Sequence, residues 1–128
     1  MASAADQRAW RKKNKAKVRE HNQRNYERHR DAHIAASRRY HLKTKFGLSL
    51  DDFDQKLREQ GGLCAVCRQP ETTIRRGERK SLDVDHNHTT GKVRGLLCSA
   101  CNTALGLLRE DPLRIRALAV YIEHYEAN

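Results

Sequence analysis

Four cysteines in two Cys-x-x-Cys pairs, Cys64/Cys67 and Cys98/Cys101, bracket residues 68–97. Two such pairs supply the four thiolates of a tetrahedral Zn2+ site, with Zn–S bonds of about 2.3 Å and little strain in the chain. Disulfides are the alternative, but residues 1–15 lack the apolar run of a secretory signal. We therefore expect reduced thiols, a cytoplasmic protein and a structural zinc ion.

The segment between the pairs contains the run Asp85-His86-Asn87-His88, and Asn102 directly follows the last cysteine. Hydrolysis of a phosphodiester needs an activated water, a stabilised negative transition state and a compensated leaving oxygen. Mg2+, or Mn2+ in its place, supplies the last two when hard oxygen ligands hold it, and Asp85 and Asn102 offer such oxygens. A histidine side chain ordinarily titrates near pH 6.5, so it can accept a proton from water near neutrality. We therefore expect His86 to be the general base of a metal-dependent hydrolase.

The charge of the chain is concentrated near its N-terminus. Residues 1–46 contain 14 Lys and Arg against 4 Asp and Glu, a net charge of +10, whereas residues 47–128 contain 12 of each. A basic segment joined to a neutral domain is typical of polyanion binders, and nucleic acid is the obvious partner. The mean hydropathy of −0.92 is too low for a large core. No apolar run approaches the roughly 20 residues of a membrane span, so we expect no membrane partner.

Residues 1–46 are predicted to form a basic DNA-binding arm. Between Asp6 and Lys45 there is neither Pro nor Gly, and residues that favour helices dominate. The large apolar side chains make no continuous stripe at helical spacing. We predict either a long, solvated basic helix or a disordered arm that becomes helical on DNA, with Arg38 and Arg39 in contact with the nucleic acid. A charged extension without a partner is the alternative.

Residues 47–128 are predicted to form one small α+β domain stapled by zinc. Ser49 and Asp52 have the spacing of a capping box, which begins a short helix over residues 49–60. Residues 68–80 are predicted to be an exposed loop. The basic residues of this loop, which include Arg75 and Arg76, either contact phosphates or are ordinary surface residues.

The segment between the cysteine pairs predicts a strand, a turn and a second strand, and a helix is predicted directly after the second pair. Residues 81–85 alternate polar and apolar, with Leu82 and Val84 inward, and residues 92–97 read as the returning strand. Residues 102–108 are expected to be helical. In this order, Asp85 and His86 end the first strand and face the helical turn that carries Asn102.

These motifs resemble the recombination endonuclease VII family over about residues 47–110. The resemblance rests on both cysteine pairs, on the run 85–88, on the segment 91–98 and on Asn102. That family belongs to the His-Me finger, or HNH-type, nucleases with a ββα-metal core. The resemblance implies a Mg2+-dependent DNA endonuclease in which Asp85 and Asn102 bind the metal and His86 is the base. It is compatible with a bacterial protein or with a phage protein that acts in the host cytoplasm.

Three further residues of the segment are candidates for the site. The resemblance places His88 at the active site, where it orients phosphate or assists the metal; capping of the loop is the alternative. Arg94 suits bidentate contact with a phosphate. The alternative, that Arg94 is an ordinary arginine on the surface of the strand, is nearly as well supported. Lys92 is grouped with Arg94 as nucleic-acid-binding.

Residues 111–128 predict a final helix with Pro112 in its first turn and a broad apolar face. That face either packs on the helix at 49–60 or pairs with a second subunit in a homodimer. Larger members of the family resolve branched DNA as dimers through an extended C-terminal region, and this chain stops too early to contain one. Nicking of duplex or branched DNA is therefore at least as well supported as junction resolution.

A second class of function remains open, a zinc-knuckle DNA-binding protein without catalysis. Such a module has no need for Asp85, His86 and Asn102 around a cation site. Magnesium-dependent nicking of plasmid DNA distinguishes the two functions.

Overall fold

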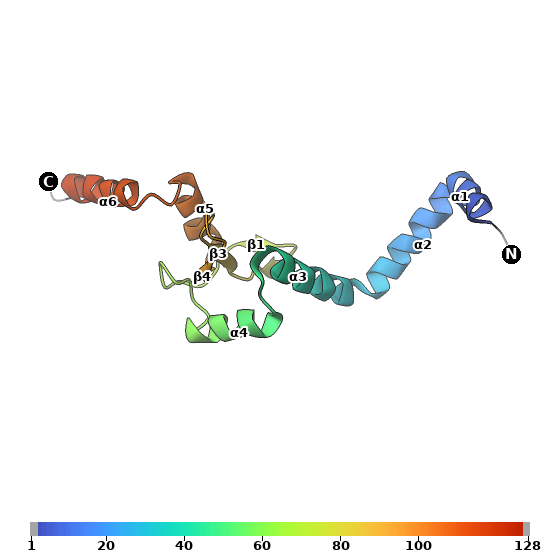
Figure 1. Cartoon of the computed structure of the whole chain (residues 1–128), viewed down its shortest axis with the longest axis horizontal. Helices are drawn as coiled ribbons and strands as arrows, with labels where there is room; N and C mark the ends of the chain where they lie inside the picture. The colour runs from blue at the N-terminus through green and yellow to red at the C-terminus, as the bar shows by residue number, and fades with distance from the viewer. Residues whose placement is uncertain (1–2, 127–128) are drawn as a thin grey trace. The chain divides into compact units, whose positions relative to one another are not determined.

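The computed structural model describes residues 3–126. Within this range it has the predicted α+β class, with six helices and two antiparallel sheets of two strands each (Figure 1). Its internal contacts divide the chain after Thr44 into two units. We call them the N-terminal arm, up to residue 44, and the domain, from residue 45 onward.

The N-terminal arm is helical, but it is not the single long helix expected from the sequence. It contains α1 (Ala4–Lys13), α2 (Lys15–Arg28) and most of α3 (Arg30–Phe46). The helices are separated at Asn14 and His29, whose φ angles are −110° and −116°. The Asn14 side chain donates to the carbonyl of Trp10 at 2.9 Å, the kind of local hydrogen bond by which asparagine competes with helix continuation.

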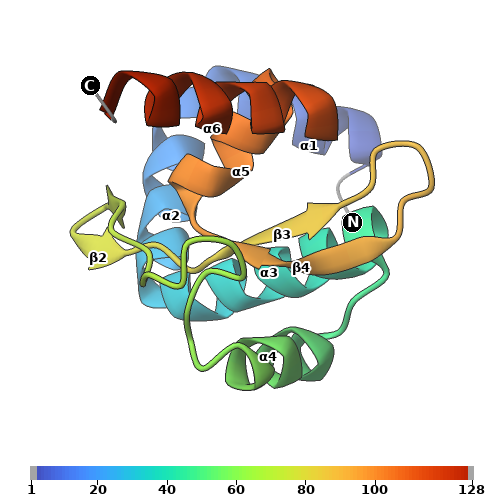
Figure 2. The same ribbon diagram turned by 90° about the vertical axis from the view of Figure 1, so that its left-hand side faces the viewer.

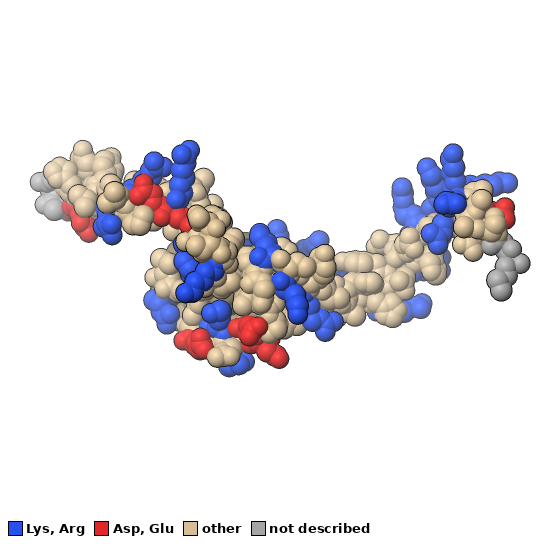
Figure 3. Space-filling view, in the orientation of Figure 1, with Lys and Arg blue, Asp and Glu red and all other residues tan. Residues whose placement is uncertain are grey.

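The first two helices of the arm are solvated, as predicted. Neither α1 nor α2 has a buried residue, and Figure 3 shows Lys and Arg side chains projecting over α1. Trp10 is 57% exposed. The positive charge of the arm is therefore displayed to solvent rather than neutralised in a core.

The centre of the domain is the hairpin of β3 (Asp83–His86) and β4 (Val93–Leu97), followed by α5 (Ser99–Leu107). The predicted order of strand, turn, strand and helix is confirmed, and Leu82 and Val84 are buried as expected. In Figure 2 the hairpin lies between α5 on one side and α4 (Leu50–Glu59) on the other. The core is small: among the described residues of the domain its buried apolar side chains are Phe53, Cys64, Leu82, Val84, Leu96, Leu97 and Cys98.

The turn of the hairpin is held by Asn87. Its side-chain oxygen accepts hydrogen bonds from the backbone N–H groups of Thr89 and Thr90 at 2.8 and 2.9 Å. Gly91 then takes a φ of +72°, which a residue with a side chain rarely adopts. These contacts explain why the chain reverses at the predicted place.

Helix α4 begins with the predicted capping box. The Ser49 hydroxyl accepts from the Asp52 N–H at 3.1 Å, and the Asp52 carboxylate accepts from the Ser49 N–H at 2.8 Å. Phe53 anchors the helix because its side chain is only 2% exposed. Figure 3 shows the acidic side chains of this helix gathered on its surface.

The side chain of Gln60 joins α4 to the hairpin. Its amide accepts a hydrogen bond from the Leu96 N–H at 2.9 Å and donates to the Leu96 carbonyl at 2.9 Å. It also donates to the Leu63 carbonyl at 2.8 Å. Gln60 thus pairs with the open edge of β4 as the backbone of a third strand would.

The segment between the first cysteine pair and β3 differs from the prediction. Residues 68–80 are not wholly a loop, because β1 (Ile74–Arg75) and β2 (Glu78–Arg79) form a short exposed hairpin. The turn between them is made by Arg76 and Gly77, with φ angles of +54° and +82°. An Arg-Gly pair is not one of the usual sequence signals for such a turn, so the sequence did not predict this hairpin.

The C-terminal helix α6 (Pro112–Glu126) begins at the predicted proline, and the Asp111 side chain accepts from the Leu113 N–H at 2.9 Å. The prediction that α6 packs on α4 is wrong, because α6 has no buried residue and Leu113 is 72% exposed. Pairing with a second subunit stays a prediction. No helix between residues 3 and 126 has both the length and the apolar character needed to span a membrane.

Replacing Gln60 by Ala should destabilise the domain by about 2 kcal/mol, because Leu96 is fully buried and its N–H would lose its only partner among the described residues. Urea unfolding of the metal-loaded protein measures the change. Gln55→Ala is the matched control, since Gln55 bonds only to Glu59 on the exposed side of α4. Equal stability of the two variants would contradict this role.

Candidate functional site

The four cysteines converge, as their spacing predicted. Their sulfur atoms all lie within 4.8 Å of one another, and the Sγ atoms of Cys67 and Cys98 are 3.8 Å apart. A tetrahedral zinc ion with Zn–S bonds of about 2.3 Å places its sulfurs about 3.8 Å apart, whereas a disulfide needs about 2.05 Å. All four cysteines are free, and the spacing of their sulfurs fits a metal ion better than disulfides.

The thiols of this cluster compete for ionisation. Burial opposes the Cys64 thiolate, but backbone N–H donors from Cys98, Cys67 and Val66 outweigh it and lower the pKa of Cys64 to about 6. Burial, together with the neighbouring sulfurs, raises the pKa of Cys101 to about 12. Four thiolates therefore require a cation between them to ionise together.

A buried carboxylate fixes the second cysteine pair against the loop that follows the first. Glu71 is 5% exposed and accepts hydrogen bonds from the N–H groups of Thr72 and Thr73, both at 2.9 Å. It also accepts from the N–H and hydroxyl of Ser99, at 2.7 and 2.9 Å. Ser99 is the first residue of α5, so the carboxylate sits where the helix dipole favours a negative charge.

Asp85 and His86 lie at the end of β3, beside an irregularity in the hairpin. Asp85 pairs with Gly95 and His86 pairs with Val93, so Arg94 is an extra residue in β4. A bulge of this kind re-aims the side chain of the extra residue. Here the Arg94 side chain reaches the Asp85 carboxylate.

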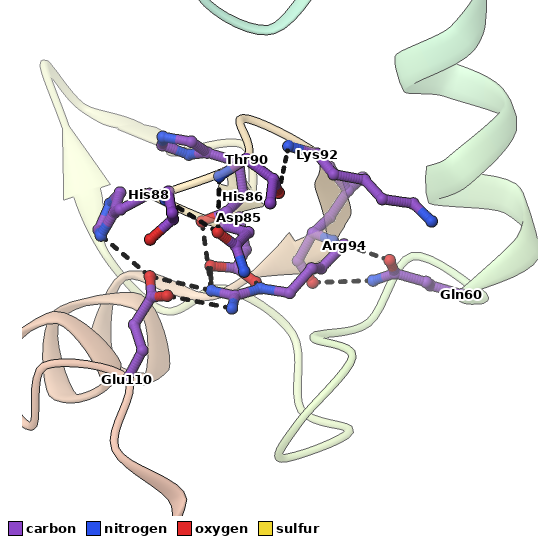
Figure 4. A network of polar contacts seen from close by, with 11 residues as sticks. Gln60, Asp85, His86, His88, Thr90, Lys92, Arg94 and Glu110 are labelled. Carbon is purple, nitrogen blue, oxygen red and sulfur yellow. Dashed lines mark hydrogen bonds and ion pairs between the residues drawn. The ribbon is translucent and has the colours of Figure 1, made fainter.

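Asp85, Arg94, Glu110 and His88 form one network of charged and polar contacts (Figure 4). The Nε and Nη2 atoms of Arg94 donate to the two oxygens of Asp85 at 2.6 and 2.9 Å. Its Nη1 and Nη2 atoms also lie 3.2 and 3.0 Å from Glu110. Hydrogen bonds from these two carboxylates raise the pKa of Arg94, and the Arg94 partner lowers the pKa of Glu110.

The two predicted site histidines are in contact with each other. Their ring centroids are 4.8 Å apart with the planes nearly perpendicular, and the His86 ring also meets the edge of Phe46 at 5.2 Å. The Nδ1 atom of His88 lies 3.0 Å from Glu110. Within residues 3–126 the imidazole of His86 makes no hydrogen bond, so both its nitrogens remain available to water or to a ligand.

Asn102 lies in the first turn of α5, which packs against both strands of the hairpin. Its side chain is partly exposed, and its amide makes no hydrogen bond to the residues that the structure describes. The Asn102 side-chain oxygen is therefore an unpaired acceptor, and a potential metal ligand, on the helix that follows the hairpin of Asp85 and His86.

The predicted DNA-contacting residues are distributed over three regions. Arg75 and Arg76 are exposed on the β1–β2 hairpin, Lys92 is exposed just before β4, and Arg38 and Arg39 are exposed on α3. Arg94 differs from them, since its guanidinium is held by two carboxylates. Its predicted contact with phosphate requires that it leave one of them.

The sequence reading missed Glu110 and Glu71. Glu110 and its neighbour Arg109 connect α5 to α6 with φ angles of +55° each. Helix ends in this left-handed conformation usually carry glycine, so the sequence contained no signal for the turn that brings Glu110 to Arg94. Glu71 stands alone in a loop, where no periodic pattern marks a buried residue.

Comparison with protein families identifies the group to which this arrangement belongs. The model of the recombination endonuclease VII family matches residues 39–124, which include both cysteine pairs, the run 85–88 and Asn102. The chain belongs to the recombination endonuclease VII family. The family resemblance stated from the motifs is thereby confirmed, and the match extends beyond the motifs into α3 and α6.

Two relatives of this endonuclease VII family chain come from phages. The Gene 59 protein of Mycobacterium phage L5 is 38% identical over 82 residues, which cover 63% of this chain and 47% of that protein. The Gene 59 protein of Mycobacterium phage D29 is 42% identical over 57 residues, which cover 44% of this chain and 32% of that protein. The chain thus spans less than half the length of either. No solved structure matches the chain.

Glu71 should make the stability of this family member depend on pH. Burial opposes its charge, but the donors on Thr73 and Ser99 prevail and lower its pKa from 4.5 to about 2. At about 1.4 kcal/mol per pH unit, this difference corresponds to about 3 kcal/mol of stability. Because the folded pKa is the lower one, the contribution is complete above about pH 5 and is lost as the pH falls toward 2.

We expect Glu71→Gln to lower the free energy of unfolding at pH 7 by on the order of 2–3 kcal/mol. The difference from the wild type should be constant from pH 7 to about pH 5 and should shrink below pH 5. Denaturant titrations at several pH values measure it, with Glu78→Gln on the exposed β1–β2 hairpin as the control. A difference that grows on acidification would refute the assignment.

Proposed function

We propose that the protein is a Mg2+-dependent DNA endonuclease with a His-Me finger (HNH-type) core, in which His86 is the general base. The observation that carries the proposal is the placement of Asp85, His86 and Asn102 on one hairpin and the helix that follows it, inside the matched family region. The four-cysteine cluster would hold one structural zinc ion, which would join the two ends of this unit.

The side chains proposed to hold magnesium are chemically suited to it. Asp85 offers carboxylate oxygens and Asn102 a neutral carbonyl oxygen, which are the hard donors that Mg2+ prefers. A Mg2+ ion held there would stabilise negative charge on the phosphate and on the leaving 3′ oxygen. Both Asp85 oxygens accept hydrogen bonds from Arg94. To bind Mg2+, Asp85 therefore has to share these oxygens with Arg94 or lose the Arg94 hydrogen bonds.

The surroundings of His86 suit proton abstraction from water. Its ring is held by edge contacts with Phe46 and His88 rather than by hydrogen bonds, so its orientation is fixed while its nitrogens stay free. An imidazole nitrogen with no hydrogen-bond partner can accept a proton from a water molecule that attacks phosphorus. His88, oriented by Glu110, is proposed to contact the phosphate from the neighbouring side.

The basic arm is proposed to bring the domain to DNA. Its exposed Lys and Arg residues attract the phosphate backbone without reading sequence, and they are expected to release counterions on binding. Duplex or branched DNA would satisfy this charge equally. Because the two Gene 59 relatives are phage proteins, we propose that the protein meets DNA in the cytoplasm of an infected host.

The second candidate is a zinc-dependent DNA-binding module without catalysis. The observation that favours it is the ion pair of Arg94 with Asp85, which leaves no unpaired carboxylate oxygen for a catalytic ion. The two functions differ in whether phosphodiester bonds are cut, and this can be measured directly.

We expect the wild type to nick supercoiled plasmid in the presence of Mg2+ or Mn2+. His86→Ala should lower the rate by about 100-fold or more, since a general base contributes about 10²–10⁴-fold. His124→Ala on α6 is the histidine control. Circular dichroism and a zinc content of one ion per chain would show that all three proteins are folded. Wild-type protein that binds the plasmid and never cuts it would decide for the binding module.

The arm generates a separate prediction for DNA affinity. Neutralising the last turn of α1, with Arg11, Lys12 and Lys13 each replaced by Gln, should weaken binding to duplex DNA. The slope of log affinity against log salt should decrease by up to about three, at about 0.9 per lost phosphate contact. Fluorescence anisotropy at several salt concentrations measures both quantities, with Gln7→Ala as the control. An unchanged slope would rule out contact between this turn and the backbone.

A further inference from the structure

We propose that Arg94 is an internal counter-cation of Asp85, which a divalent metal ion must displace, and that Glu110 retains the displaced guanidinium beside the site. The proposal rests on the proposed metal role of Asp85. It assigns to Arg94 and Glu110 a positioning role that precedes any contact with DNA.

Arg94 pairs with both oxygens of the buried Asp85 carboxylate. Asp85 is 8% exposed, and each of its oxygens accepts one hydrogen bond from the guanidinium, at 2.6 and 2.9 Å. A buried carboxylate without a partner is strongly unfavourable. Arg94 therefore supplies the positive charge that Asp85 requires in the absence of a metal ion.

Arg94 reaches Asp85 because of the irregularity in the β3–β4 hairpin. The extra residue in β4 places Arg94 between the partners of Asp85 and His86. Nη2 of Arg94 also donates to the His86 carbonyl at 3.2 Å. The guanidinium thus occupies both oxygens of Asp85, so a metal ion bound by this carboxylate would compete with Arg94 for them.

Glu110 is the other carboxylate partner of the Arg94 guanidinium. Glu110 contacts Nη1 and Nη2 at 3.2 and 3.0 Å, while Asp85 contacts Nε and Nη2. Because Glu110 is already in contact, Arg94 can release Asp85 without losing all its partners. The side chain of Arg94 is 37% exposed and that of Asp85 is 11% exposed, so the release is toward solvent, where a phosphate would arrive.

Replacing Arg94 and replacing Glu110 should change the affinity for Mn2+ in opposite directions. Arg94→Gln removes the competing cation, so Mn2+ should bind about tenfold more tightly. Glu110→Gln removes the alternative acceptor and commits Arg94 to Asp85, so Mn2+ should bind several-fold more weakly. A merely structural role would weaken binding in both variants.

The measurement is calorimetric titration of Mn2+ into the zinc-loaded full-length chain without DNA. Asp85→Asn should abolish the binding, and Glu78→Gln controls for the loss of one carboxylate elsewhere in the domain. In the double variant with both Arg94→Gln and Glu110→Gln, the loss caused by Glu110→Gln should be smaller than in the wild type. That non-additivity separates an effect through Arg94 from direct attraction between Glu110 and the ion.

Several outcomes would overturn the proposal. Changes of the same sign in both single variants, or additive effects in the double variant, reject the competition between Arg94 and the metal. If one of these results is found while Asp85→Asn still abolishes Mn2+ binding and the wild type still nicks plasmid, only this inference fails. If Asp85→Asn binds Mn2+ as the wild type does and no nicking occurs, the proposed nuclease function fails with it.

Discussion

The convergence of four sulfur atoms is the constraint on which the domain depends. The apolar core is small, with Phe53, Leu96 and a few neighbours buried in the domain, and so small a core offsets little of the conformational entropy lost on folding. A metal ion held by four thiolates contributes on the order of 10 kcal/mol. The same four sulfurs join the segment before the hairpin to the start of α5, so an ion that stabilises the fold would also fix both ends of the candidate site.

Polar side chains do much of the positioning that apolar packing does in larger domains. Gln60 completes the edge of β4, and Glu71 binds the first residue of α5 to the loop after Cys67. Between residues 3 and 126, every buried side-chain nitrogen or oxygen has a hydrogen-bond partner. In a small core such contacts specify one arrangement, because a shift of either helix would leave a buried polar group unpaired.

The features that could be predicted from the sequence are local ones. Cysteine spacing, the Ser49 capping box and the alternation around Leu82 each depend on residues a few positions apart, and the structure follows all three. The contact of Arg94 with Glu110 joins residues 16 positions apart and needs a bulge and a left-handed turn that no residue type marked. The breaks of the arm at Asn14 and His29 were missed for a similar reason, since neither residue excludes a helix.

The buried position of Asp85 separates the requirements of folding from those of chemistry. A carboxylate at this depth must be neutralised at all times, because an unpaired charge there would destabilise the hairpin by several kcal/mol. Arg94 meets that need from within the chain, so the hairpin can form without an exchangeable ion. Under the proposed function, zinc would thus serve the fold and magnesium the reaction. The affinity for magnesium would then be set by how readily Glu110 accepts Arg94, and not by the stability of the domain.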